Sequence, residues 1–369
     1  MARYFEDFKK GDVIVTRGRT VTEADIMQYA GLCWDTQREH TNIEFAKKTA
    51  FGGRIGQQQL GMLIAHGLMH GSRTLDTTLA SVLRLEWHYL NPIKIGDTLH
   101  VKFTVVDTKE SSVPNTGMVI FDFETINQRN QIVHQCRRYT LVARKPASPA
   151  QSKDRCAYAY HGLSDLEPAH ARHTNPKASA SKPSAKSQPK AVRPPNQGPK
   201  GKYYEEFELG EELVTEARTV AEADIINYTM LSWDNDALHT DAEFGRRSEY
   251  GGLVAPLLLP IVFANGLGAT LGYLAGTNRG ALGDWWEFVA PVRIGDTLRF
   301  RQFVVDSKDA KDPETGIVTW SMEMVNQHDV VVSRGERSSL VQRVPQGEPD
   351  NDWKFVFGTV GELSKEQKS

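Results

Sequence analysis

The second half of this chain repeats the first at a constant offset of 199 residues. Of the 49 positions from 5 to 53, 22 are identical to the residue 199 positions later. The match continues without a gap as far as Asn127 and Gln128, which align with Asn326 and Gln327. A match of this length indicates two copies of one unit of about 140 residues, an ordinary domain size. We therefore expect domains at residues 1–143 and 203–346, and a tail at 347–369.

Composition changes abruptly between the two copies, in residues 144–202. This segment holds nine of the chain's 17 prolines, and 12 Lys or Arg against three Asp or Glu. Because it has few large apolar side chains, it cannot bury enough surface to offset its conformational entropy. We expect a disordered, basic linker. The alternative is a tether that docks on an acidic or phosphate-bearing partner.

Charge, cysteine usage and hydropathy exclude several classes of protein. The 44 basic and 46 acidic side chains give a formal net charge of −2, which provides no overall attraction to nucleic acid or an anionic membrane. Three cysteines at unrelated spacings fit neither a disulfide framework nor a zinc motif. Acidic residues near the N-terminus do not fit an export signal, and the most apolar stretch, 257–276, is interrupted by proline and glycines. We expect a cytoplasmic protein with no nucleic-acid and no membrane partner.

The periodicity of each copy predicts an α+β fold. In the first copy, a short helix should run from Glu23 to Leu32, and a longer helix with one apolar face should begin near Gln58. Four stretches of alternating apolar residues predict strands, near 83–89, 99–105, 119–123 and 132–142. The economical arrangement is a curved antiparallel sheet wrapped around the long helix, with two such units paired sheet beside sheet. Small residues such as Gly67 should let this helix lie close to the concave face of the sheet.

Both copies carry the same pattern around an Asp and a His five residues apart. The first copy has Asp25, Tyr29, Leu32, Asp35, His40, Glu44-Phe45-Ala46 and Phe51-Gly52-Gly53, and the second has Asp224, Tyr228, Leu231, Asp234, His239, Asp241, Glu243-Phe244 and Tyr250-Gly251-Gly252. This pattern resembles the MaoC-like, or R-specific enoyl-CoA hydratase, family. The two-copy layout is similar to the mesaconyl-CoA (β-methylmalyl-CoA) type of hydratase within it. The resemblance implies a tandem, or double, hotdog fold.

The resemblance also implies that Asp35 with His40, and Asp234 with His239, are catalytic pairs. Adding water to a 2-enoyl thioester needs a base for the water and an acid for the α carbon, and a carboxylate and an imidazole that hold one water can serve as both. Backbone N–H groups at the start of the central helix would stabilise the thioester oxygen. The family's His-Gly at this helix entry is Gln57-Gln58 here and Pro256-Leu257 in the second copy. The sequence leaves open whether one or both halves catalyse.

Further residues close to the pairs are candidates for substrate binding: Trp34, Trp233, Gly53, Arg54, Gln57, Gln58, Gly252 and Leu257. The tryptophans fit an acyl pocket and a core position equally well, and the glycines also fit a turn before the helix. Arg54 and the glutamines could bind a second carboxylate of a dicarboxylic acyl group or lie on solvated surface. His66 and His70 have a zinc-compatible spacing, but their counterparts are Asn265 and Ala269, so we expect no metal.

The favoured hypothesis is a hydro-lyase, a hydratase or dehydratase acting at the double bond of a 2-enoyl-CoA or 3-hydroxyacyl-CoA thioester. Its acyl group could be branched or dicarboxylic, as in mesaconyl-CoA. The CoA thioester would be the substrate, and we expect no cofactor. The alternatives are a hotdog acyl-CoA thioesterase and a non-catalytic acyl-thioester-binding protein. One chain would form a pseudo-dimer, and a homodimer of whole chains also fits.

Overall fold

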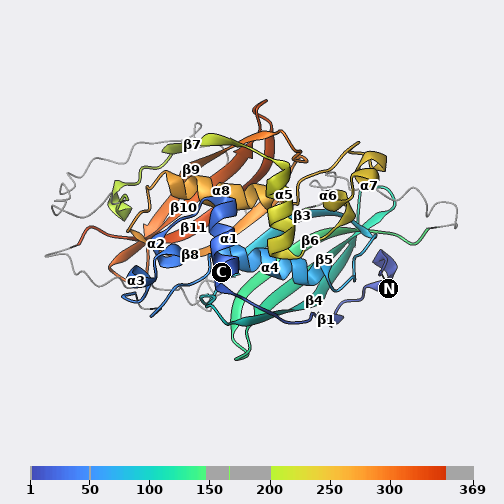
Figure 1. The fold of residues 1–369 in the computed structure, drawn as a ribbon, viewed down its shortest axis with the longest axis horizontal. Helices are drawn as coiled ribbons and strands as arrows, with labels where there is room; N and C mark the ends of the chain where they lie inside the picture. The colour runs from blue at the N-terminus through green and yellow to red at the C-terminus, as the bar shows by residue number, and fades with distance from the viewer. Residues whose placement is uncertain (1, 50, 147–165, 167–200, 346–369) are drawn as a thin grey trace.

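The computed structural model describes residues 2–49, 51–146, 166 and 201–345 (Figure 1). Most of the expected linker and the expected tail lie outside these residues. The first copy comprises η1 (Phe5–Asp7), β1 (Val13–Val15), β2 (Arg19–Thr20), α1 (Glu23–Cys33), α2 (Arg38–Thr41), α3 (Ile43–Ala46), α4 (Gln58–His70), β3 (Leu79–Tyr89), β4 (Thr98–Glu110), β5 (Thr116–Ile126) and β6 (Ile132–Ala143). The second comprises η5 (Tyr204–Glu206), β7 (Glu212–Thr219), α5 (Glu222–Ser232), α6 (Ala237–Thr240), α7 (Ala242–Arg247), α8 (Leu259–Thr270), β8 (Asn278–Phe288), β9 (Thr297–Asp309), β10 (Thr315–Val325) and β11 (Val331–Gln342).

The two copies share one continuous sheet. Its eleven strands run in the order β1-β4-β5-β6-β3-β8-β11-β10-β9-β7, with β2 paired to β4 off this path. The copies meet where β3 pairs antiparallel with β8, so that Leu85 lies opposite Trp286. At this seam the guanidinium of Arg84 forms a buried ion pair with Glu287 of the other copy. The expected tandem hotdog, with sheet beside sheet, is confirmed.

One central helix lies against the sheet in each copy, α4 in the first and α8 in the second (Figure 1). Nearly every residue of α4 is buried, including the polar Gln59 and His66, so the expected apolar face is only part of its buried surface. The short helices α1 and α5 lie in front of the central helices and cross them (Figure 1). Helix α1 begins with a capping box, in which Thr22 Oγ1 accepts from the Asp25 N–H and Asp25 Oδ2 accepts from the Thr22 N–H.

Two equivalent glycines of the central helices, Gly67 and Gly266, face the other copy rather than the sheet. A Cβ on Gly67 would lie 1.8 Å from the carbonyl oxygen of Ser232, at the end of α5 in the other copy. A Cβ on Gly266 would lie 1.4 Å from the carbonyl oxygen of Cys33, at the end of α1. The expectation that Gly67 faces the concave sheet was wrong, because this position is where the other copy's helix ends against α4. Each central helix therefore touches the segment that carries the other copy's Asp.

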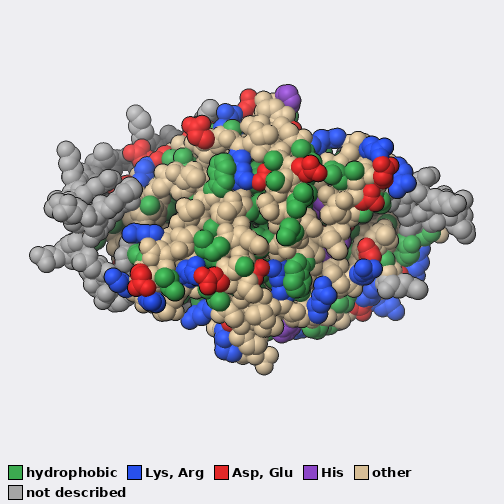
Figure 2. Space-filling model, in the orientation of Figure 1, with side chains coloured by type: hydrophobic (Ala, Val, Ile, Leu, Met, Phe, Trp, Pro, Cys, Tyr) green, Lys and Arg blue, Asp and Glu red, His purple; other side chains and the backbone are tan. Residues whose placement is uncertain are grey.

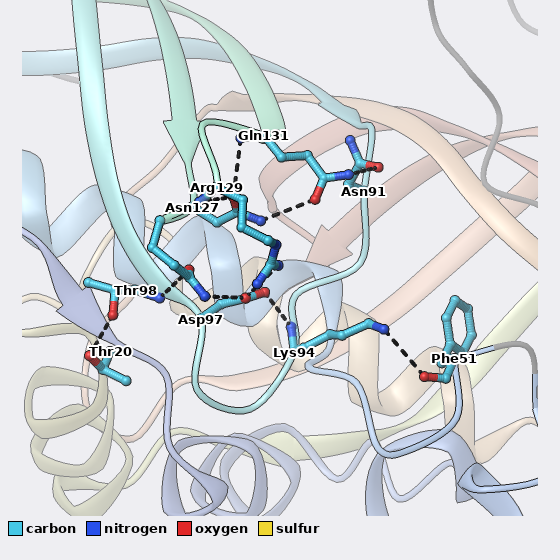
Figure 3. Close-up of polar contacts among 10 residues, drawn as sticks. Thr20, Phe51, Asn91, Lys94, Asp97, Thr98, Asn127, Arg129 and Gln131 are labelled. Carbon is cyan, nitrogen blue, oxygen red and sulfur yellow. Dashed lines mark hydrogen bonds and ion pairs between the residues drawn. The ribbon is translucent and has the colours of Figure 1, made fainter.

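The Gly-Asp-Thr turn before β4 is held by its own carboxylate (Figure 3). Asp97 is 1% exposed and accepts hydrogen bonds from the Lys94 N–H at 2.9 Å, Gln128 Nε2 at 3.2 Å and Arg129 Nη2 at 2.7 Å. Because these donors surround the carboxylate, its role is to fix the turn. No helix among the described residues is long and apolar enough to cross a membrane.

Candidate active site

The first site is assembled around Asp35, which follows the C-terminal end of α1. The chain turns there because Trp34 adopts a left-handed conformation, with φ of 74°. Asp35 is 2% exposed, and His40 on α2 is 8% exposed. Both side chains line one cavity of about 140 Å³. The structure therefore brings together the first predicted pair.

Both oxygens of the Asp35 carboxylate accept hydrogen bonds. Asn265 Nδ2, on the central helix of the other copy, donates to Oδ2 at 3.0 Å. Gln37 donates to Oδ1 through its Nε2 at 3.1 Å and its backbone N–H at 3.3 Å. These donors stabilise the charged carboxylate and fix its orientation. Asn265 was not predicted as a site residue, although a polar residue within an apolar helical stretch is a usable signal.

The imidazole of His40 is fixed by a backbone carbonyl. Its Nδ1–H donates to the Ile55 carbonyl oxygen, with the two atoms 2.9 Å apart. Because a carbonyl only accepts, this contact assigns the proton of the neutral ring to Nδ1 and leaves Nε2 as an acceptor. His239 makes the equivalent contact with the Val254 carbonyl oxygen at 2.8 Å.

The wall of the first cavity comes from both copies. The first copy supplies the pair and the entry of α4, including Gln57, Gln58 and Gln59. Helix α4 begins at Gln58, so the N–H groups of Gln58 and Gln59 have no carbonyl four residues earlier in the helix to bind, whereas the Leu60 N–H donates to the Gln57 carbonyl oxygen at 3.1 Å. Gln57 is 1% exposed, and neither polar atom of its amide has a hydrogen-bond partner among the residues that the structure describes. The second copy supplies small residues of α8 and side chains of its sheet, among them Asn278, Arg337 and Ser339.

The second site is smaller and differently built. Asp234 and His239 line a cavity of about 60 Å³, together with Leu257 and with His66 and His70 of α4. Gly268 and Ala269 of α8 line the first cavity, whereas their equivalents on α4 are the larger Met69 and His70. Helix α8 also begins later than α4, at Leu259, and has Pro260 in its first turn, which provides no N–H.

Two imidazoles of the first copy face the Asp234 carboxylate. His66 Nε2 lies 3.6 Å and His70 Nδ1 lies 3.7 Å from its oxygens. Burial alone would raise the pKa of Asp234, but His66, His239, His70 and the Asp236 N–H outweigh it, and the net pKa is lowered. Burial lowers the pKa of His66 to about 3, with Asp234 opposing the shift. His66 is therefore neutral at physiological pH.

This buried neutral imidazole predicts a pH-dependent stability. Between about pH 6.5, where an unfolded His66 titrates, and about pH 3, the unfolded chain binds one proton that the folded chain does not. The free energy of unfolding must therefore rise with pH across this window. We expect His66→Asn, which copies Asn265, to reduce this slope by about 1.4 kcal/mol per pH unit. Urea unfolding at several pH values measures it, with the exposed His328→Asn as control, and an unchanged slope in His66→Asn would contradict the expectation.

The other predicted binding residues lie elsewhere. Trp34 and Trp233 line neither cavity and are 46% and 42% exposed, and each ring stacks under an arginine of the other copy. They directly follow α1 and α5. The face of the molecule in Figure 2 shows hydrophobic side chains among charged ones. We therefore do not assign them to the acyl pocket. Gly53 and Gly252 lie in turns outside both cavity linings.

Arg54 is also outside both cavity linings, and its guanidinium pairs with Glu23. Of the residues considered for a second carboxylate, only the glutamines line the first cavity. Within the described residues, no group of three or more His, Cys, Asp or Glu side chains is arranged to hold a metal ion. The expectation of a reaction without a cofactor stays a prediction.

Comparison with known proteins identifies the unit that is repeated. The model of the MaoC like domain matches residues 7–124 and again 206–326. Mesaconyl-CoA hydratase of Cereibacter sphaeroides is 27% identical over 326 residues, covering 85% of this chain and 86% of the relative. The (R)-specific enoyl-CoA hydratase of Rhodospirillum rubrum is 34% identical over 125 residues, covering 32% of this chain and 77% of the relative.

Solved structures agree on the fold. A MaoC domain dehydratase from Chloroflexus aurantiacus superposes with a TM-score of 0.72 at 18% identity, covering 93% of this chain and 98% of that chain. A Mycobacterium tuberculosis protein with a double hotdog fold superposes with a TM-score of 0.67 at 18% identity, covering 92% and 98%. The repeat, the shared sheet and the two matched segments lead to one conclusion: the chain belongs to the MaoC-like domain family and is a tandem of two such domains.

Proposed function

We propose that the protein is a hydro-lyase that reversibly adds water to the double bond of a 2-enoyl-CoA thioester, and that the reaction takes place at the first site. The observation that carries the proposal is that Asp35, His40 and the start of α4 line one cavity. Relatives that are hydratases by name act on CoA thioesters of this kind, which supports the reaction class.

The first site orients water through two acceptors. With its proton on Nδ1, His40 offers Nε2 as an acceptor, and the Asp35 carboxylate offers a second. A water molecule between them donates one hydrogen to each, which leaves an oxygen lone pair directed away from the pair toward the substrate. His40 then acts as the base for this water, and Asp35 stabilises the imidazolium that forms.

The remaining steps complete the addition. The water oxygen bonds to the β carbon, the double-bond electrons move toward the thioester carbonyl, and the proton held by the pair is transferred to the α carbon. Negative charge develops on the thioester oxygen, and the N–H groups of Gln58 and Gln59 at the start of α4 are the donors that we assign to it. Binding the water and the enoyl group in one cavity also reduces the entropic cost of bringing them together from solution.

The second site supports this chemistry less well. Its cavity is about 60 Å³ against 140 Å³, two histidines crowd its carboxylate, and Pro260 removes a donor from the first turn of α8. We therefore assign the second pair to the structure of the interface between the copies.

The test follows the conjugated enoyl thioester by its ultraviolet absorbance, with a thiol reagent added in parallel. For a hydratase we expect the absorbance to fall until the hydration equilibrium is reached, with no free thiol released. Release of thiol would instead support the thioesterase alternative. Binding without either change would support the non-catalytic alternative. Crotonyl-CoA and mesaconyl-CoA are suitable first substrates.

A further inference from the structure

The inner wall of the first cavity carries a guanidinium group that the reaction itself does not use. Arg337 lies on β11 and lines the cavity together with Ser339, two residues further along the same face of the strand. Its side chain is 19% exposed. A charged side chain is therefore presented to the same space as Asp35 and His40.

Arg337 is held rigidly from behind by a network that joins the two copies. Its Nε and Nη2 donate to Asp284 Oδ2 at 3.3 and 2.9 Å, and the Tyr89 hydroxyl of the first copy donates to the same carboxylate at 3.0 Å. Burial alone would lower the pKa of Arg337. The interactions with Asp284 and Tyr89 outweigh burial, so the pKa lies above its ordinary value. Within the described residues, no hydrogen bond uses Nη1, so one edge of the guanidinium is available.

The equivalent arginine of the first copy is arranged differently. Arg138 is fully buried and donates to Thr140 Oγ1 at 3.0 Å and Met69 Sδ at 3.1 Å. The position equivalent to Asp284 is Leu85, and Arg138 does not line the second cavity. The same residue type is therefore enclosed in one half and presented to a cavity in the other. Gly268 and Ala269, in place of Met69 and His70, leave the space in front of Arg337 open.

We propose that Arg337 forms a subsite for a second carboxylate on the acyl group, so that the preferred substrates are 2-enoyl thioesters of dicarboxylic acids. This proposal rests on the proposed hydration at the first site. A carboxylate that moves from water into the cavity loses its hydration. It needs a fixed cation and further hydrogen-bond donors there, because an unpaired buried charge would weaken binding. The free edge of Arg337 supplies the cation in a planar geometry suited to carboxylate. The unpartnered amide of Gln57 lines the same cavity and offers a second donor.

Two esters of nearly equal shape test the subsite. Mesaconyl-CoA and (E)-2-methylbut-2-enoyl-CoA differ only in a carboxylate that replaces a methyl group on the β carbon. We expect the unmodified protein to hydrate mesaconyl-CoA with the higher kcat/KM. Arg337→Met should lower kcat/KM for mesaconyl-CoA by about 100-fold and leave kcat/KM for (E)-2-methylbut-2-enoyl-CoA within about threefold of the unmodified value. Equal losses for both esters, or no loss for either, would overturn the subsite.

Two further variants keep the result interpretable. Arg334→Met removes a guanidinium from the opposite face of β11, where it pairs with Glu287. This variant should leave kcat/KM unchanged for both thioesters. Because Arg337→Met leaves the buried Asp284 carboxylate without its cationic partner, Arg337→Met/Asp284→Asn removes both charges and should show the same selective loss. If the unmodified protein hydrates only (E)-2-methylbut-2-enoyl-CoA, the proposed subsite is rejected and the proposed function stands. If it hydrates neither, the proposed function fails, and calorimetric binding of the two esters still decides the subsite: equal affinities would reject it.

Discussion

Asp35→Asn is expected to lower kcat for enoyl-CoA hydration by about 1,000-fold, whereas Asp234→Asn should leave it within about threefold. The asparagine keeps the size of the side chain and its contact with Asn265, but it removes the charge that stabilises the imidazolium of His40. Asp234 occupies the equivalent position in the other copy, so Asp234→Asn is a control of identical chemistry. Steady-state rates for one enoyl-CoA ester, measured side by side, give the comparison.

His40→Ala and His239→Ala extend this comparison to the imidazoles. We expect the same asymmetry, because only the first pair lines the larger cavity. Equal losses at both sites would show that both halves catalyse. Full activity in Asp35→Asn and His40→Ala would exclude the proposed mechanism at the first site.

Gly266→Ala is expected to destabilise the fold by about 3 kcal/mol or more and to abolish most activity. The added Cβ would lie 1.4 Å from the Cys33 carbonyl oxygen, and this is a backbone atom that no rotamer change can move. Helix α8 and the end of α1 would have to separate. That movement would also break the contact between Asn265 and Asp35, which lie next to these residues.

Gly31→Ala is the matched control for this change. Gly31 lies in α1, and an added Cβ would meet no atom of the described part of the chain within 4 Å. Because Ala is favoured over Gly in a helix, we expect this variant to be as stable as the unmodified protein or slightly more stable. Urea unfolding of both variants measures the difference, and a Gly266→Ala protein of normal stability would contradict the close contact.

The sequence predicted the architecture because the repeat is visible as residue identity between the two halves, and because periodicity depends only on residues close together in the chain. Helices α1 and α4 begin at the expected residues, and strands β3 to β6 contain the four expected stretches, although β3 begins four residues earlier and β4 ends five residues later than expected. The short helices α2 and α3 were not predicted, since four residues are too few to show a helical period. The hydrophobic pattern also predicted that α4 and α8 each direct an apolar face into the protein interior.

The composition of each cavity could not be predicted in the same way. A periodic pattern shows that Gly67 and Gly266 lie on a packed face, but not whether the neighbour is a sheet or the other copy. Asn265 acquires its role only because α8 lies against the end of α1 from the first copy. Arg337 aligns with Arg138, so nothing in the repeat distinguishes an arginine that lines a cavity from one that is enclosed. The sequence shows that Met69 and His70 align with Gly268 and Ala269, but only the structure shows that the smaller pair lines the first cavity.

The crossing of the two copies has a consequence for how such a chain can change over time. Asp35 binds Asn265 of the second copy, and the network behind Arg337 includes Tyr89 of the first copy, so residues of both halves build the first cavity. A half whose own Asp and His no longer turn over substrate still cannot be deleted, because its central helix and strands remain walls of the surviving site. Duplication thus frees one set of reactive groups to drift while selection continues to preserve the scaffold around them.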